Sequence, residues 1–288
     1  MLDKIAISGT EYPFRPIEEL YQMAEHLGVK NLELWFPHNF QNEELQKISR
    51  ELRARDLKAI CISTWTQFNL PGDVSERQSL IKQSIQVAKF LGAPIVNTYF
   101  GANPNRTPKQ AIKAYKENIQ PCLEAAEKNG IVIVLENEFD RTGVDITRKA
   151  ERVLELVQAV NSPYFRLNYD PCNFYFAGEE PYPFAFELLK KYIACVHLKD
   201  GMKYHPNLYE YPGDGFLWQD KSGDYICTDL GKGAIPYSSI FRRLKDENYT
   251  GFLGMEPHVP LDKLGKTFET SLQYLKKQLT LQERETKK

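Results

Sequence analysis

The chain alternates eight times between a short apolar segment and a longer segment of helical period. The apolar segments are continuous hydrophobic runs and do not alternate with polar residues. Continuous runs are typical of strands that are buried on both faces, as in a parallel sheet. The eight predicted strands are Lys4–Ser8, Asn31–Phe36, Lys58–Thr64, Pro94–Phe100, Ile131–Glu138, Arg166–Tyr169, Ile193–Leu198 and Gly251–Glu256.

Each predicted strand is followed by a segment in which apolar residues recur every three or four positions, the period of an amphipathic helix. In the first such segment Leu20, Ala24 and Leu27 share one face, and Gly28 suits the position just after a helix. The pair Thr107-Pro108 likewise suits the start of a helix. The predicted helices are Pro16–Leu27, Glu43–Arg55, Val74–Leu91, Pro108–Lys128, Thr147–Val160, Pro183–Tyr192, Ile235–Lys245 and Leu261–Leu279.

This order of elements predicts parallel strands that are connected by crossover helices. An open doubly wound sheet alternates in the same way. Eight units in 288 residues without an internal linker favour closure into a (β/α)8 TIM barrel, which typically needs about 250 residues. We therefore expect an α/β protein with a single barrel domain over residues 1–280, followed by a C-terminal tail, residues 281–288, as a frayed helix end.

Composition and charge exclude several classes of protein. The 37 basic and 38 acidic residues nearly balance, which argues against a nucleic-acid-binding surface. The five cysteines are scattered without CxxC spacing, so neither a disulfide framework nor a cysteine zinc site is expected. Because the sequence shows no signal-peptide pattern and no apolar run of about 18 residues, we predict a cytoplasmic protein that does not bind a membrane.

One connection is much longer than the others. Residues 201–234 separate the seventh predicted strand from its helix, and loops longer than about 12–15 residues are usually functional or disordered. The aromatic content of this segment argues against simple disorder. It is either a packed surface excursion or a lid or rim over the strand ends, and we favour the lid. Its large aromatic residues are Tyr204, Tyr209, Tyr211, Phe216, Trp218 and Tyr225.

Ligand-type side chains stand at the carboxyl ends of four consecutive predicted strands, where β/α barrels form their active sites. They are Glu136, Asp170, His197 and Glu256. Three carboxylates at one mouth repel one another and lose solvation, and a divalent cation offsets that cost. Three carboxylates and one imidazole suit Mn²⁺ or Mg²⁺, with Zn²⁺ or Co²⁺ as alternatives. Mn²⁺ is the metal that we expect.

The motifs around these residues resemble those of the xylose isomerase-like TIM barrel superfamily. They are LEN with Glu136, NYDPCN with Asp170, VHLKD with His197 and MEPH with Glu256. The segment Leu230–Pro236 also resembles the Gly-x-Gly turn of this superfamily. The superfamily comprises sugar isomerases, ketose 3-epimerases, inosose dehydratases, hydroxypyruvate isomerases and endonuclease IV. The resemblance implies that the four residues bind the metal, and that Glu136 and Glu256 are also the catalytic acid–base pair.

The resemblance further implies a metal-dependent isomerase or epimerase of a sugar, a sugar phosphate or a polyol ketone. In that chemistry the metal polarises a carbonyl, a carboxylate removes the adjacent proton, and an enediolate forms. Three alternatives remain: a dehydratase or keto-glycoside lyase, a carbohydrate-binding protein without turnover, and an endonuclease IV-like nuclease. Few histidines and balanced charge argue against the nuclease. We expect a small carbohydrate-like substrate, no nucleic acid, and a barrel that is compatible with a homo-oligomer.

Further residues near the strand ends are predicted to contact the substrate. Asn173 departs from the family, because many relatives carry a histidine three residues after the aspartate; an amide still suits a hydroxyl but is a poor metal ligand. Lys199 either binds substrate or forms a structural ion pair, and His258 either contacts substrate or lies behind the site. The predicted substrate-binding residues are Trp35, Trp65, Asn173, Lys199, Asp200, Lys203 and His258. Earlier strand ends add Glu11, Glu33, His38, Gln67, Asn97 and Tyr99.

Overall fold

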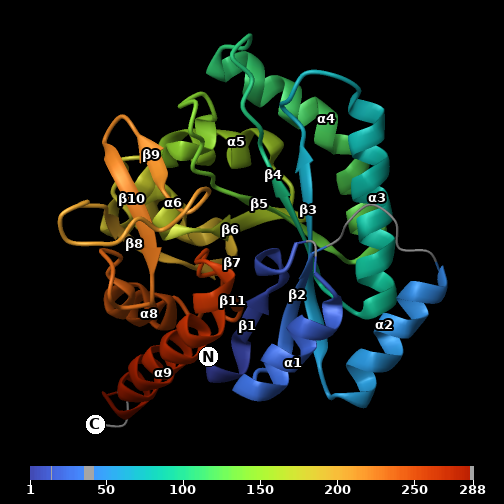
Figure 1. Ribbon diagram of the computed structural model, residues 1–288. Coiled ribbons are helices and arrows are strands. Elements are labelled where there is room, and N and C mark those ends of the chain that lie inside the picture. Colours follow the sequence, from blue (N-terminus) through green and yellow to red (C-terminus); the bar gives the residue numbers. More distant parts are fainter. Residues whose placement is uncertain (14, 36–41, 286–288) are drawn as a thin grey trace.

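The computed structural model describes residues 1–13, 15–35 and 42–285, which form one closed barrel of eight parallel strands (Figure 1). The strand order around the barrel is β1-β11-β7-β6-β5-β4-β3-β2, so the chain winds once around it. The predicted fold class, a single-domain (β/α)8 TIM barrel, is confirmed. The barrel strands are β1 (Ile5–Ser8), β2 (Asn31–Trp35), β3 (Lys58–Gln67), β4 (Ile95–Tyr99), β5 (Val132–Glu136), β6 (Phe165–Tyr169), β7 (Ile193–Leu198) and β11 (Phe252–Met255).

Helices cover the outside of this barrel (Figure 1). The start of α4 has the predicted cap: the backbone N–H of Gln110 donates to the Thr107 hydroxyl, and the Gln110 side chain accepts from the Thr107 N–H. Gly28 ends α1 with a φ of 66°, a left-handed conformation that glycine adopts without strain. The helices are α1 (Ile17–Leu27), α2 (Asn42–Ala54), α3 (Val74–Leu91), α4 (Pro108–Asn129), α5 (Ala150–Val160), α6 (Pro171–Phe176), α7 (Phe186–Leu189), α8 (Tyr237–Asp246) and α9 (Leu261–Glu285).

Two predicted helices are shorter than expected. The segment predicted as Pro183–Tyr192 contains only one regular α-helical turn, α7, between a π-turn over Pro181–Ala185 and a 3-10 turn over Lys190–Tyr192. Pro181 and Pro183 have no backbone N–H, so this end cannot form a regular helical ladder. The helix predicted from Thr147 begins at Ala150, and a 3-10 turn precedes it. Asp145 caps that turn by accepting the Thr147 N–H at 2.8 Å.

The long segment after β7 folds into a second, three-stranded antiparallel sheet that the sequence did not predict. Its strands are β8 (Asp200–Lys203), β9 (Trp218–Asp220) and β10 (Gly223–Thr228), in the order β8-β10-β9. Figure 1 shows this sheet beside α6 and outside the barrel. A Cβ atom at Gly201 would lie 2.5 Å from the Phe176 ring, so only glycine lets β8 approach α6 this closely.

The barrel interior changes from apolar to polar along the strands. A separate cluster of small and medium apolar side chains comprises Ala6, Ile60, Cys61, Ile95, Val134 and Cys195. Successive strand residues alternate between faces, so a residue two positions further along a strand lies on the same face. For five members of the cluster that residue is polar and buried: Ser8, Ser63, Asn97, Glu136 and His197. An apolar layer therefore supports a polar layer at the carboxyl ends of the strands.

Two further predictions concern cysteines and membrane spans. All five cysteines are free, and four of them are buried, as the prediction of a chain without a disulfide framework requires. Across the described residues, every helix is too short or too polar to cross a lipid bilayer. The predicted strand-end residue His38 lies outside the described residues.

Candidate metal centre

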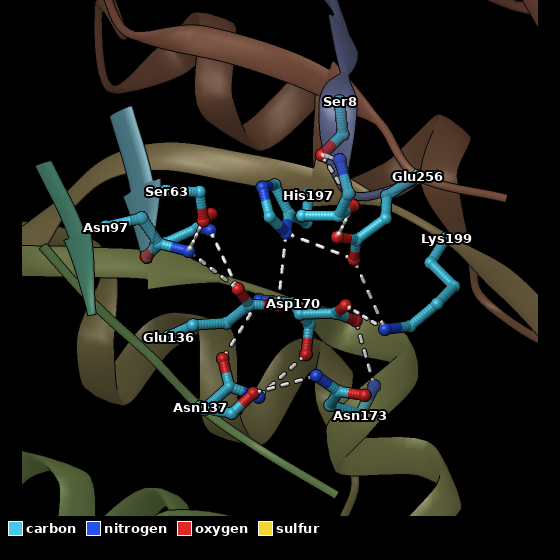
Figure 2. A network of polar contacts seen from close by, with 12 residues as sticks. Ser8, Ser63, Asn97, Glu136, Asn137, Asp170, Asn173, His197, Lys199 and Glu256 are labelled. Carbon is cyan, nitrogen blue, oxygen red and sulfur yellow. Dashed lines mark hydrogen bonds and ion pairs between the residues drawn. The ribbon is translucent and has the colours of Figure 1, made fainter. Parts of the chain in front are cut away.

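Four ligand-type side chains meet at the carboxyl end of the barrel. Glu136 ends β5, Asp170 directly follows β6, His197 lies in β7 and Glu256 directly follows β11. One ligand atom of each lies within 4.8 Å of the corresponding atoms of the other three, and all four residues are buried. Figure 2 shows the four side chains converging from different strands. The structure thus brings together the four residues that the sequence singled out.

His197 lies at the centre of this group. Its Nδ1 atom is 3.0 Å from Glu136 Oε1 and 3.2 Å from Glu256 Oε2. On the opposite side of the ring, Nε2 is 2.8 Å from Glu33 Oε2. A carboxylate on the outer nitrogen of a histidine fixes the ring and leaves the other nitrogen for a metal. Glu33 lies outside the four motifs that carry the predicted ligands. Because it holds Nε2, Nδ1 is the nitrogen that faces the centre.

Neutral donors hold the two glutamates from behind. Asn97 donates to Glu136 Oε2 at 3.0 Å, and Asn168 donates to the same oxygen at 3.3 Å. The Thr10 hydroxyl donates to Glu256 Oε1 at 2.7 Å. In each glutamate one oxygen is thus anchored, whereas the other faces His197. This arrangement fixes the orientation of both carboxylates without neutralising them.

Asp170 is held by its backbone as well as by its side chain. The Asn137 side chain accepts from the Asp170 N–H at 2.9 Å and donates to its carbonyl at 2.8 Å. Asp170 Oδ1 caps α6 by accepting the Asn173 N–H at 2.9 Å. The other oxygen, Oδ2, lies 2.7 Å from the Lys199 ammonium in an ion pair but accepts no aligned hydrogen bond. It is a buried carboxylate oxygen with unused capacity for a ligand.

The charges of the centre test whether a divalent cation fits. The carboxylates of Glu33, Glu136, Asp170 and Glu256 face Lys199, His197 and, at a greater distance, His258, whose ring also pairs with the carboxylate of Glu11. Even with these three bases protonated, the five carboxylates leave at least two negative formal charges uncompensated. Burial of such charge is costly without a cation. The donor set therefore fits a divalent metal, and so do Asp170 Oδ2 and Glu33 Oε1, two buried carboxylate oxygens that accept no hydrogen bond.

The pKa shifts follow from this crowding. Burial raises the pKa of Glu136, and the charge of His197 only partly opposes the shift. Burial also disfavours the charged form of His197, but Glu136, Glu256 and Glu33 hold its pKa well above 6.5. For Glu256 the positive charges of His197, His258 and Lys199 outweigh burial and hold the pKa well below its usual range. A proton on His197 Nδ1 occupies the position that a metal would take between the glutamates.

Five of the seven predicted substrate-binding residues line one cavity of about 860 Å³ that reaches the centre. Glu136 and Glu256 lie at the bottom of this cavity, and Glu138, which the sequence analysis did not single out, also lines it. The five predicted residues are Trp35, Trp65, Asn173, Lys199 and His258. A larger cavity, about 1170 Å³, lies at the opposite end of the barrel among the strand starts and holds none of the candidate ligands.

Asp200 and Lys203 are outside the described lining of the cavity at the centre. Asp200 is buried, and its carboxylate accepts four backbone N–H groups, from Gly201, Gly231, Gly233 and Ile235, at 2.8–3.1 Å. It thereby holds the Gly-x-Gly turn, where a Cβ at Gly233 would lie 2.1 Å from Asp200 Oδ1. Lys203 is exposed at the end of β8. The contacts of Asp200 therefore hold a turn of the backbone, and Lys203 lies on the surface.

His258 and Glu11 form a second polar pair beside the centre. Glu11 Oε1 lies 2.7 Å from His258 Nδ1 and accepts the His258 backbone N–H at 2.9 Å. Nε2 of His258 lies 3.7 Å from Glu256 Oε2. Glu11 therefore orients the imidazole edge toward the candidate catalytic glutamate. The signal for this pair in the sequence was weak, because the two residues are separated by nearly the whole chain.

A family model described as "Xylose isomerase-like TIM barrel" matches residues 21–278, nearly the whole chain. The chain belongs to the xylose isomerase-like TIM barrel family. Two relatives within reach of sequence comparison are enzymes. Hydroxypyruvate isomerase of Escherichia coli K12 is 22% identical over 82% of this chain and 85% of its own length. Inosose dehydratase of Clostridium perfringens strain 13 is 26% identical over 86% of this chain and 75% of its own length.

Solved structures show the same xylose isomerase-like barrel. A D-tagatose 3-epimerase-like protein superposes with a TM-score of 0.75 at 18% identity, over 98% of this chain and 99% of that one. The IOLI protein, whose structure contains a zinc atom, superposes with a TM-score of 0.75 at 18% identity, over 97% of both chains. At this identity the likeness establishes the fold alone. The family contains isomerases, epimerases and dehydratases of sugars and related polyols, and the reaction differs among these distant relatives.

Proposed function

We propose that this chain is a metal-dependent isomerase or epimerase of a sugar, a sugar phosphate or a polyol ketone, which abstracts a proton next to a carbonyl. The observation that carries the proposal is the convergence of Glu136 and Glu256, which come from different strands and both approach His197 Nδ1 within 3.2 Å. Two carboxylates that reach one substrate from different strands allow a proton to be removed on one face and returned on the other.

Four residues would hold the metal: Glu136, Asp170, His197 through Nδ1, and Glu256. A bound divalent cation polarises the carbonyl of the substrate and stabilises the negative charge that develops on its oxygen. Mn²⁺ suits this oxygen-rich donor set best, and Mg²⁺, Zn²⁺ and Co²⁺ are the alternatives. The zinc atom in the related IOLI structure supports metal binding in this fold.

Other functions in the proposed reaction, proton transfer and substrate binding, fall to residues that line the cavity. Glu136 or Glu256 takes the proton with the oxygen that faces the centre, since the other oxygen of each is engaged by Asn97 or Thr10. Lys199 lines the cavity and presents a positive charge to substrate oxygens.

Solvent deuterium exchange tests this proposal. The full chain is loaded with Mn²⁺ and incubated in deuterated buffer with a panel of ketoses, sugar phosphates and inososes, and deuterium in each recovered compound is measured by NMR. We expect exchange at the carbon next to the carbonyl, reduced about 10²-fold or more by Glu256→Gln and by Glu136→Gln. Glu269→Gln, on the exposed face of α9, is the matched control. Exchange that survives both active-site substitutions contradicts the mechanism, as does its absence across the whole panel.

A second candidate is a dehydratase or a keto-glycoside lyase that starts from the same proton abstraction. The pair of His258 and Glu11 favours it, because it places an oriented imidazole 3.7 Å from Glu256 where a leaving group needs a proton. The inosose dehydratase relative supports the same chemistry. Mass spectrometry separates the two: loss of water or of an aglycone indicates the second candidate, whereas an isobaric product indicates the first.

A further inference from the structure

The cavity above the candidate metal centre has two chemically different parts. Its inner part carries the charged residues Glu136, Lys199 and Glu256. The rest of the cavity is lined by a few polar residues, among them Arg15, Gln67, Asp140 and Arg141, and by a larger number of aromatic and aliphatic side chains, which we call its outer part: Trp35, Trp65, Leu70, Tyr99, Phe139, Phe216, Trp218, Val259, Leu261 and Leu264. A volume of about 860 Å³ lies near the top of the range of about 300–1,000 Å³ that is typical of pockets for drug-sized ligands. The cavity is thus much larger than a single sugar ring requires.

Three rings form the wall on the side of β2, β3 and β4. The Trp65 ring packs edge-on against Trp35 with centroids 5.2 Å apart, and it lies tilted against Tyr99 at 5.2 Å. Despite these contacts Trp65 is 59% exposed. Large exposed aromatic residues at the mouth of a pocket commonly mark a binding surface. The two neighbouring rings hold the indole in place before any ligand arrives.

A second group of rings forms the opposite wall. Trp218, in β9 of the small sheet, lies stacked on His258 at 5.8 Å and edge-on to Phe139 at 6.0 Å. Its indole N–H is buried and has no hydrogen-bond partner. The part of this wall that faces the cavity is therefore the aromatic surface of the rings, which suits a flat apolar group.

One ion pair and one cation–π contact hold the small sheet beside the cavity. Arg148, which precedes α5, forms a nearly buried ion pair with Asp220 at the end of β9. The Arg141 guanidinium lies 5.5 Å from the centre of the Trp218 ring. These contacts join the β5–α5 connection to β9 and keep Trp218 in position. From residues 201–234, for which a lid was one expectation, Gly215, Phe216 and Trp218 line the cavity.

Charged side chains at the outer rim are already engaged. Arg15 donates to Glu19, and the Asp140 carboxylate accepts from the Thr142 hydroxyl and three backbone N–H groups of its own loop. A second sugar ring would bring several hydroxyls that need partners, and the largely aliphatic and aromatic lining offers few beyond Gln67 and Arg141. A flat apolar group has no such need and gains from contact with the rings.

We propose that the outer part of the cavity binds an aromatic substituent of the substrate, so that the substrate class is a keto sugar that carries an aryl group, such as an aryl keto-glycoside, and not a free monosaccharide. The inference rests on the proposed function for the sugar end, which would lie on Glu136 and Glu256. The aromatic group would lie between Trp65 and Trp218.

Matched ligands test this inference. Isothermal titration calorimetry measures the affinity of the Mn²⁺-loaded full chain for the methyl and phenyl glycosides of glucose, galactose and xylose. We expect the phenyl glycoside of at least one sugar to bind about three- to tenfold more tightly than its methyl counterpart. Trp65→Ala and Trp218→Ala should each reduce that ratio toward one. Phe90→Ala, an exposed aromatic residue that lines the cavity at the opposite barrel end, should leave it unchanged.

Equal affinities for every pair, including the lack of measurable binding, overturn the inference, and so does a ratio that both tryptophan substitutions leave unchanged. The two proposals fail separately. Phenyl preference without any deuterium exchange removes the proposed function and keeps an aryl-binding cavity. Exchange with free sugars and no phenyl preference removes the aryl group from the substrate and leaves the proposed function intact.

Discussion

His197 Nε2 lies 2.8 Å from Glu33 Oε2, and both side chains are buried beneath the candidate metal centre. Glu33 belongs to β2 and His197 to β7, on different sides of the barrel. The contact holds the imidazole so that Nδ1 points at Glu136 and Glu256. Outer partners of this kind increase the basicity of a histidine ligand and fix its ring, so Glu33 should determine how tightly the centre binds a metal.

Glu33→Ala should therefore weaken Mn²⁺ binding about 10- to 100-fold, which a competition titration against a metal-sensitive dye measures. Glu33→Gln keeps an acceptor for the Nε2 proton and should restore part of the affinity. Glu25→Ala, on the exposed face of α1, is the control and should change nothing. If Glu33→Ala and Glu25→Ala bind Mn²⁺ equally well, the positioning role of Glu33 is refuted.

Metal removal should lower the stability of the protein. A ligand that binds only the folded state stabilises it by about 2.7 kcal/mol at a concentration 100 times its Kd. Adding Mn²⁺ to chelator-treated protein should thus raise the denaturation temperature. Asp170→Asn should remove most of this increase while it preserves the cap of α6, because asparagine also caps helices well. Asp73→Asn, at the cap of α3, is the matched control. A denaturation temperature that does not respond to saturating Mn²⁺ contradicts the metal centre.

Lys199 should matter most when the metal is absent. Its ammonium lies 2.7 Å from Asp170 and 3.5 Å from Glu256, all buried. Removing one partner of a buried ion pair typically costs about 3–5 kcal/mol, so Lys199→Met should destabilise the metal-free protein by this order. With Mn²⁺ the loss should be smaller, because the cation supplies the missing charge. Urea unfolding of both forms measures the difference, with the exposed Lys266→Met as control. Equal losses with and without Mn²⁺ would show that the lysine does not share a charge site with the metal.

Sequence patterns were sufficient for the barrel and for the convergence of four ligand-type residues. Each of these residues stands at the end of a buried apolar run, and parallel strands bring such ends to one rim. Val134 and Glu136 are two residues apart on one strand, as are Cys195 and His197 on another. In both pairs the first residue belongs to the apolar layer and the second to the polar layer. This pattern is local in the sequence, so it can be recognised without any knowledge of tertiary contacts.

Tertiary contacts explain what the sequence did not predict. Asp200 follows the VHL strand end as a ligand would, yet its carboxylate accepts four N–H groups of a turn that lies some thirty positions further along the chain. Strands β8 to β10 are short and polar, and they are stabilised by packing on α6. Trp218 is a wall residue because it packs against Phe139 and His258, which are distant from it in the sequence. None of these relationships has a period or a spacing that a sequence displays.

Asp145 should make stability depend on pH. Burial raises its pKa from 3.8 to about 6, although hydrogen bonds from Thr147 oppose the shift. Because the folded pKa exceeds the unfolded one, the folded state takes up the proton first as the pH falls from about 7 to about 4.5. This group alone should then stabilise the folded state, by at most about 3 kcal/mol. Asp145→Asn cannot titrate, so the urea midpoint of the wild type should gain on that of the variant as the pH falls. A difference between the midpoints that stays constant over this range would contradict the raised pKa.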